Sequence, residues 1–244
     1  MLLEAHALGH SFDGQHELFS DLSFRFTAGD MVAVIGPSGS GKSTLLSILA
    51  GWLSPTRGHI TREGIDSISW VFQNPLGIKN RSAIDHVCLP LLAKGFTRRE
   101  AYPRALETLA IFGLEHLADK RFSELSGGEA QRLMLAKAHM KAPDLLLVDE
   151  PTAQLDRTLA ASVNKVLSHI ASTHTIVIVA THDSDTHKAC HSVLDLGKFA
   201  SPQQKISSSA QTIHDAHDQI APTFSLQSQG KQDTATTTDR QEYL

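Results

Sequence analysis

The sequence has few cysteines, no excess of basic charge and no long apolar run, and each shortage argues against a class of protein. Its two cysteines, Cys88 and Cys190, form no CxxC pair, which is typical of a chain in a reducing compartment. Lys and Arg number 22 against 26 Asp and Glu, a formal net charge of −4, so we expect no nucleic-acid partner bound through a broad basic field. No apolar run approaches the roughly 20 residues that span a bilayer. Residues 1–6 lack the pattern of a secretion signal, and we therefore expect a cytoplasmic protein.

The composition suits one large domain with a core of its own. The 244 residues are 41% hydrophobic and 20% charged, so no disulfide or metal is needed to hold the fold together. Residues 31–35, 145–148 and 175–180 are continuous apolar runs, typical of strands buried on both faces of a sheet. Residues 43–53 and 98–112 have helical character and lie between these runs. We therefore predict an α/β fold with a mostly parallel sheet.

Two segments depart from this alternation of strands and helices. Residues 75–125 predict a helix-rich insertion into the α/β core. Residues 200–244 contain 6 Ser, 6 Thr and 8 Gln, and their few large apolar residues are too sparse to offset the entropy of ordering. We expect the folded body to end near Phe199 and the tail to be largely disordered. His214 and His217 in this tail are expected to be solvated rather than bound to metal.

The strongest functional signal is a glycine-rich stretch that fits G-x-x-x-x-G-K-[ST] between a buried strand and a helix. Glycines let the backbone curl so that its N–H groups converge on phosphate oxygens, and the positive N-terminus of the following helix adds to that field. Lys42 is predicted to neutralise the β- and γ-phosphates, and the Ser43 hydroxyl to bind Mg²⁺. The predicted phosphate-binding residues are Gly36, Pro37, Ser38, Gly39, Ser40, Gly41, Lys42, Ser43 and Thr44.

Two carboxylates follow the apolar run at residues 145–148. Open α/β sheets place their ligand chemistry at the carboxyl ends of the strands, which is where Asp149 and Glu150 stand. We predict that Asp149 holds Mg²⁺, directly or through water, and that Glu150 is the general base that polarises the attacking water. Such a run alone is more often a strand that exits to solvent, but the phosphate-binding stretch upstream favours the functional interpretation.

A third signal is the stretch Leu-Ser-Gly-Gly-Glu at residues 125–129. Ser126 and Glu129 form a capping box at the start of a predicted helix. Gly127 and Gly128 each cost roughly 1 kcal/mol against alanine in a helix, which is reasonable where bare backbone N–H groups must approach an anion. The pattern therefore predicts a second contact to the γ-phosphate as well as a capped helix.

Taken together, residues 36–44, 125–132 and 145–152 resemble the ATP-binding subunits of ABC transporters. The signature stretch combined with the other two motifs in this order is highly specific, and the resemblance covers about residues 1–199. It implies a P-loop ATPase core with an antiparallel β subdomain and a helical subdomain inserted at about residues 76–140. It also implies ATP and Mg²⁺ as ligands.

The resemblance implies roles for three further residues. Phe12, 24 residues before Gly36, stands where the family has the aromatic residue that stacks on adenine, although a core phenylalanine on an edge strand is the alternative. Gln73 matches the glutamine that senses Mg²⁺ and the γ-phosphate and links to the permease. His182 matches the histidine that contacts the γ-phosphate. The predicted catalytic residues are Glu150, His182 and Gln73, and the predicted metal-binding residues are Ser43, Gln73 and Asp149.

The resemblance also implies an assembly. Two such subunits enclose two ATP molecules, each bound by the phosphate loop of one chain and the signature of the other, so Ser126, Gly127 and Gly128 act in trans in a homodimer. Closure of the dimer drives a separate membrane permease, which holds the subunit at the inner face of the cell membrane. Gln154 departs from the family, which usually has Ser or Asn there, and its longer side chain can alter coupling across the dimer.

Two questions stay open at this point. Residues 75–125 resemble the lipoprotein-release and macrolide-export ATPases, whereas residues 58–73 are closer in length to some small-molecule importers, so neither substrate nor direction of transport follows. The competing hypothesis is a soluble ABC ATPase without a transporter, such as an iron–sulfur assembly ATPase. Chromosome-type members are disfavoured because the sequence lacks sustained heptads, and translation-type members because it has a single ATPase domain.

Overall fold

The computed structural model describes residues 1–153, 155–172 and 174–200. The predicted tail from residue 201 onward, with His214 and His217, lies outside the described residues, and so does Gln154. The strands are β1 (Leu2–Ser11), β2 (Glu17–Thr27), β3 (Met31–Ile35), β4 (Arg57–Glu63), β5 (Ile68–Val71), β6 (Leu145–Asp149), β7 (Ile176–Ala180) and β8 (Ser192–Asp195). The α-helices are α1 (Lys42–Leu49), α2 (Ala83–Ala93), α3 (Arg98–Ile111), α4 (Gly127–Lys141), α5 (Arg157–Ser172) and α6 (Ser184–Ala189).

These strands form two sheets of different kinds. A five-stranded sheet has the order β5-β6-β7-β3-β8, and each of its neighbouring pairs is parallel. A three-stranded antiparallel sheet has the order β2-β1-β4. The predicted α/β fold with a parallel sheet and an antiparallel β subdomain is confirmed.

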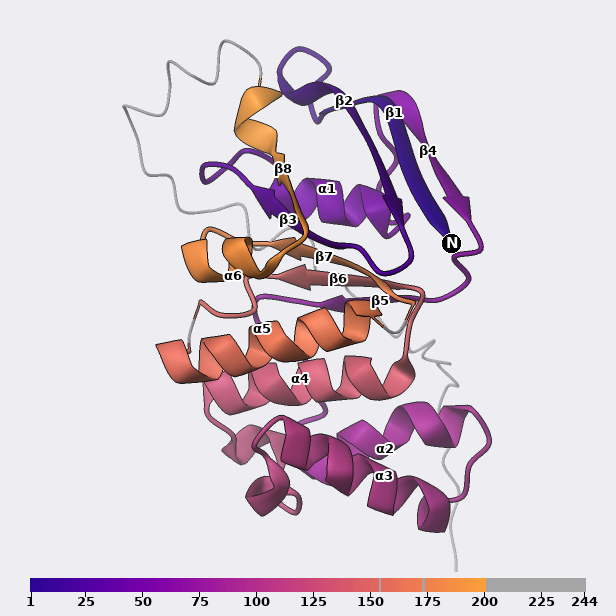
Figure 1. Ribbon diagram of the computed structural model, residues 1–244, viewed down its shortest axis with the longest axis vertical. Helices are drawn as coiled ribbons and strands as arrows, with labels where there is room; N and C mark the ends of the chain where they lie inside the picture. Colours follow the sequence, from indigo (N-terminus) through magenta and orange to yellow (C-terminus); the bar gives the residue numbers. More distant parts are fainter. Residues whose placement is uncertain (154, 173, 201–244) are drawn as a thin grey trace, which may run out of the picture. The chain divides into compact units, whose positions relative to one another are not determined.

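The parallel sheet is buried on both faces, as its continuous apolar runs predicted. In β6, Leu146 and Val148 belong to the core formed with α2 to α5. Leu145 and Leu147 belong to the other core, which is shared with α1 and the antiparallel sheet. Side chains alternate between the faces of a strand, so a strand that is apolar at every position supplies both cores. Figure 1 shows α1 between the two sheets and α4 and α5 across the parallel sheet from it.

The helix after the glycine-rich stretch is shorter than the predicted 43–53. It ends at Leu49, and Gly51 has a φ of 78°, a left-handed conformation that is typical of the end of a helix. Arg62 of β4 donates from its guanidinium to the carbonyl oxygens of Leu49 and Ile48, at 3.1 and 2.7 Å. A cation at a helix C-terminus is favourable, so the antiparallel sheet helps to terminate α1.

Helices α2, α3 and α4 lie in the chain between β5 and β6 and pack on one another. Each has a side-chain N-cap: Ser82 for α2, Thr97 for α3 and Ser126 for α4. The helix predicted at 98–112 is confirmed, with Ala101, Ala105 and Leu109 on its buried face. No helix in the described part of the chain combines the length and apolar character required to cross a bilayer.

Candidate functional site

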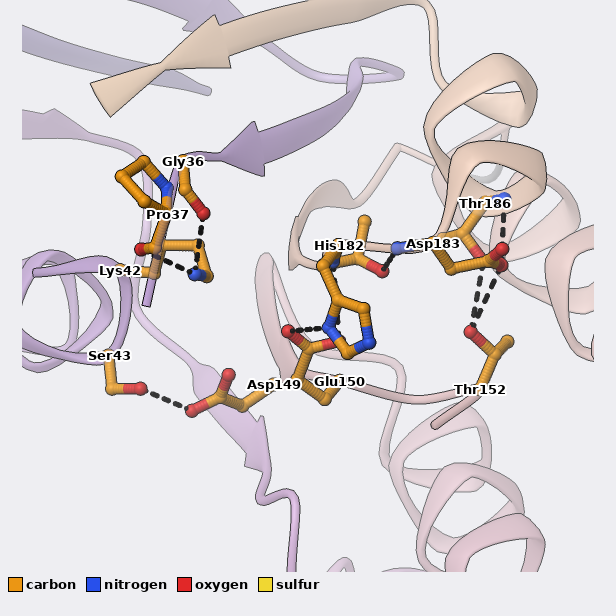
Figure 2. A network of polar contacts seen from close by, with 11 residues as sticks. Gly36, Pro37, Lys42, Ser43, Asp149, Glu150, Thr152, His182, Asp183 and Thr186 are labelled. Atoms are coloured by element: carbon orange, nitrogen blue, oxygen red, sulfur yellow. Dashed lines mark hydrogen bonds and ion pairs between the residues drawn. The ribbon is translucent and has the colours of Figure 1, made fainter. Parts of the chain in front are cut away.

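The predicted site residues gather at the carboxyl edge of the parallel sheet. The glycine-rich loop follows β3, Asp149 and Glu150 end β6, and His182 follows β7. Ala180, at the end of β7, pairs with Asp149 of β6 on one side and with Val34 of β3 on the other. The ends of these three strands therefore lie side by side. Figure 2 shows Lys42, Ser43, Asp149, Glu150 and His182 around one space.

The glycine-rich loop depends on residues that lack a side chain. Gly41, the N-cap of α1, has a φ of 90°, and a Cβ there would stand 3.2 Å from the ring of Phe19. Lys42 folds back over the loop, since its Nζ donates to the carbonyls of Gly36 at 2.9 Å and Pro37 at 3.3 Å. Pro37, Ser38 and Gly39 are exposed, Thr44 is half-buried, and Ser40 is buried with its hydroxyl unpartnered. This loop therefore presents an exposed backbone and the ammonium group of Lys42 to the same space.

Ser43 and Asp149 are in direct contact although 106 residues separate them. The Ser43 hydroxyl donates to Asp149 Oδ2 at 2.7 Å. Asp149 is about nine-tenths buried at the end of β6. A hydroxyl oxygen beside a carboxylate oxygen is a ligand pair that suits Mg²⁺, which binds through one or two carboxylates plus phosphates and water. The donor set fits the metal that the sequence predicted.

Glu150 and His182 form a second pair. His182 Nδ1 lies 2.8 Å from Glu150 Oε1, and the His182 N–H donates to Oε2 at 3.4 Å. The Glu150 side chain is only 10% exposed, whereas that of His182 is 71% exposed. Glu150 also has a φ of 46°, a left-handed conformation that costs a residue with a Cβ roughly 1 to 3 kcal/mol and that recurs at functional sites. The fold thus holds this carboxylate in a strained backbone and fixes its direction by two hydrogen bonds.

Gln73 follows the end of β5, the strand that pairs with β6. β5 is parallel to β6, with Val71 opposite Val148, so Gln73 and Glu150 each stand two residues beyond a matched position. The side chain of Gln73 is exposed. Its position at the strand ends suits a group that reaches the bound phosphates.

Phe12 is not a core residue. It follows β1 with 68% of its surface exposed, and its ring meets that of His10 edge-to-face with centroids 4.7 Å apart. The same hairpin carries Phe19, which packs on Gly41 of the loop. The Phe12 ring is exposed and lies on the hairpin that supports the glycine-rich loop, which suits stacking on a base. The alternative, a buried phenylalanine on an edge strand, is wrong.

The signature segment lies on a different helix. Ser126 Oγ accepts from the Glu129 N–H at 3.3 Å, and the Ser126 N–H donates to Glu129 Oε2 at 2.7 Å, so the predicted capping box is confirmed. The hydrogen bond from the Ser126 backbone lowers the pKa of Glu129. Ser126 and Gly127 are exposed. Their helix packs on α2, α3 and β5, whereas the phosphate loop is held by β2, β3 and α1.

A polar network around Asp183, directly after His182, was not predicted from the sequence. Asp183 Oδ2 accepts from Thr186 Oγ1 at 2.6 Å and from Thr152 Oγ1 at 3.2 Å (Figure 2). The side-chain oxygen of Asn164 lies 3.1 Å from the same Thr186 hydroxyl. Burial opposes ionisation of Asp183, but the hydrogen bonds from Thr186 and its neighbours outweigh it and lower the pKa. The signal was present, because an Asp after a buried strand and before a helix is a typical N-cap. The network joins the segment after Glu150 to the segment after His182.

Comparison with known proteins supports one family. The sequence profile of the ABC transporter family matches residues 19–153. The lipoprotein-releasing system ATP-binding protein LolD of Chromohalobacter salexigens is 39% identical over 173 residues, which cover 64% of this chain and 73% of LolD.

Solved structures agree with this match. A dimeric ATP-binding cassette in a post-hydrolysis state, bound to ADP and Pi, is 27% identical with a TM-score of 0.71, over 80% of this chain and 95% of that one. The protein cbiO1 of Clostridium perfringens, part of the ABC transporter complex cbiONQ, is 28% identical with a TM-score of 0.70, over 80% and 85%. The resemblance expected from the three motifs is therefore confirmed, and the chain belongs to the ABC transporter family as a nucleotide-binding subunit that hydrolyses ATP to drive transport.

Proposed function

We propose that the carboxyl edge of the parallel sheet binds Mg-ATP and that Glu150 activates the attacking water. The observation that carries this proposal is the placement of two pairs side by side: Ser43 with Asp149 at 2.7 Å, and Glu150 with His182 at 2.8 Å. The first pair offers oxygen ligands to a divalent cation. The second offers a carboxylate base with a fixed direction.

The phosphates lie along the glycine-rich loop in this proposal. Backbone N–H groups of residues 38–44 at the N-terminus of α1 surround the phosphate oxygens. Lys42 leaves the carbonyls of Gly36 and Pro37 and neutralises the β- and γ-phosphates. Phe12 stacks on the adenine ring from the antiparallel sheet.

Three oxygen-bearing side chains would hold the cation: Ser43, Asp149 and Gln73. When bound, Mg²⁺ would offset the negative charge that develops on the phosphate oxygens during transfer. Glu150 accepts a proton from water as the water oxygen attacks the γ-phosphorus, the bond from that phosphorus to the β–γ bridging oxygen breaks, and ADP is the leaving group. His182 orients Glu150 through Nδ1 and contacts the γ-phosphate from the exposed side of its ring.

The signature acts in trans in this proposal. Ser126, Gly127 and Gly128 start a helix whose first N–H groups are exposed, and they cover the γ-phosphate bound by a second copy of the chain. The dimer closes on ATP and opens after hydrolysis, so ATP shifts a two-state equilibrium. A separate permease uses this motion and keeps the homodimer at the cytoplasmic face of the membrane.

The relatives suggest which permease to seek first. LolD belongs by name to a lipoprotein-releasing system and cbiO1 to the complex cbiONQ. The higher identity to LolD makes a permease of the lipoprotein-releasing kind the first candidate partner. None of the relatives reported above is an iron–sulfur assembly ATPase, so we retain that alternative only as an outcome of the test.

The test is co-purification of the tagged Glu150→Gln chain, with Mg-ATP, from detergent-solubilised membranes. This variant should keep ATP bound and so keep the closed dimer together. We expect a protein with several membrane-spanning helices to co-purify with the tagged chain in a near-equal amount. This protein should no longer co-purify when EDTA replaces Mg²⁺. Recovery of soluble partners alone, with the chain absent from the membrane fraction, would contradict the coupling to a permease and favour the assembly ATPase.

A further inference from the structure

The loop that follows Gln73 is attached to α2 by a buried histidine. His86 is 1% exposed, and its Nε2 accepts from the Ile78 N–H at 2.9 Å. Its Nδ1 lies 2.8 Å from the carbonyl oxygen of Ser82. A backbone N–H only donates and a carbonyl only accepts, so His86 is neutral, with its proton on Nδ1 and a bare Nε2.

The same histidine meets the segment that leads to the signature. Its ring lies against Phe122, with centroids 5.4 Å apart. A Cβ at Gly77 would overlap the Phe122 ring, so this glycine is required for the close contact. The Phe122 N–H donates to the Arg81 carbonyl at 2.9 Å. The segment after Gln73 and the segment before Ser126 are thus packed and hydrogen-bonded to each other around His86.

A second contact holds the other end of this loop. Gln131 of α4 is 4% exposed, and its Nε2 donates to the carbonyl of Phe72 at 3.2 Å. Phe72 directly precedes Gln73, and α4 is the helix that Ser126 caps. Gln73 therefore stands between one hydrogen bond to α4 and one to α2.

We propose that His86 and Gln131 are positioning residues that make Gln73 and the signature move as one body. The inference rests on the proposed function, in which Gln73 reaches the phosphates in cis and Ser126 reaches them in trans. A shift of Gln73 on ATP binding is carried to Ser126 through these two hydrogen bonds and the contact of Phe122 with Gly77. Of the four residues that connect Gln73 to Ser126 in this way, His86, Gln131, Phe122 and Gly77, only His86 has a side chain that can gain a proton.

The first test replaces His86 by Leu, which removes the side-chain acceptor of the Ile78 N–H. We expect kcat for ATP hydrolysis to fall by roughly tenfold, the scale of one lost hydrogen bond. Equilibrium binding of Mg-ATP to the monomer should change much less than kcat, because the phosphate loop, which supplies most of the contacts to the phosphates, lies elsewhere. The matched control is His139→Leu, which changes a half-buried histidine on α4 beside Phe112 and should leave kcat unchanged. Wild-type kcat in His86→Leu, or an equal loss of ATP affinity, would overturn the inference.

The second test uses pH and a conservative variant. Burial lowers the pKa of His86, with Lys137 and Arg81 acting in the same direction and the Ser82 carbonyl and Asp85 against it. Below the ordinary histidine pKa of 6.5, protonation of Nε2 would place a donor against the Ile78 N–H, so the wild-type kcat should fall on the acid side. His86→Gln keeps an acceptor that does not titrate, and we expect wild-type kcat at pH 7.5 without that acid loss. An identical acid limb in this variant would overturn the inference.

A third variant separates this inference from the function it rests on. Gln73→Ala removes the side chain that both hydrogen bonds are proposed to position. Wild-type kcat in Gln73→Ala would overturn the proposed role of Gln73. A low kcat in Gln73→Ala beside a wild-type kcat in His86→Leu would overturn only the linkage.

Discussion

The phosphate loop and the signature segment are both helix N-termini prepared for an anion, but the fold supports them differently. The loop joins a buried strand to α1, and its Ser43 hydroxyl bonds to Asp149 on another strand. At the start of the signature helix, the side-chain hydrogen bonds of Ser126 and Glu129 join these two residues to each other. The first half-site is thus bonded to a core strand through Asp149, whereas the tip of the second is capped by its own glutamate and is exposed. That difference fits the proposal that the two half-sites meet across a dimer.

The largest expected effect comes from the half-site tied to the core. Lys42→Ala removes the cation that the loop holds against Gly36 and Pro37, and we expect Mg-ATP binding to be abolished. Equilibrium titration with a fluorescent ATP analogue measures this. Lys188→Ala, which changes an exposed lysine on α6, is the control. Binding at wild-type affinity in Lys42→Ala would remove this lysine from the site.

The next effect separates binding from chemistry within the same half-site. Glu150→Gln preserves the shape of the side chain but cannot accept a proton, so hydrolysis should slow by roughly 10² to 10⁴. ATP should stay bound, because Ser43, Asp149 and Lys42 are unchanged. Release of phosphate and retention of nucleotide are measured on the same sample, with Glu63→Gln as the control. Turnover at the wild-type rate would exclude Glu150 as the base.

The smallest expected difference from the wild-type rate is that of a mixture of two inactive variants, and it tests the exposed half-site directly. Gly128→Asp puts a carboxylate in the first turn of α4, where it favours the helix but repels a phosphate. This variant and Lys42→Ala should each be inactive alone. If the signature acts in trans, an equal mixture of the two variants should recover roughly a quarter of the wild-type rate. Half of the dimers then contain one chain of each kind, and in each of these dimers one of the two sites is intact. No recovery on mixing would contradict a signature that acts in trans.

The features that the sequence predicted well are those made by neighbouring residues. The capping box of Ser126 and Glu129 spans a single turn, and the strands at 145–148 and 175–180 were indicated by unbroken apolar runs. The end of α1 was predicted four residues too late, because Gly51 ends the helix through its left-handed conformation and Arg62 from a distant strand caps it.

Local spacing was therefore enough to propose the phosphate loop, the carboxylate pair and the signature, since each depends on the backbone geometry of a few consecutive residues. Only the tertiary structure brought Ser43 to Asp149, turned Glu150 toward His182 and set His86 between Ile78 and Phe122. Those contacts depend on strand register and helix packing, because a shift of one residue in a strand turns every side chain to the other face. The residues of this site could be named from the sequence, but their pairing was decided by the sheet.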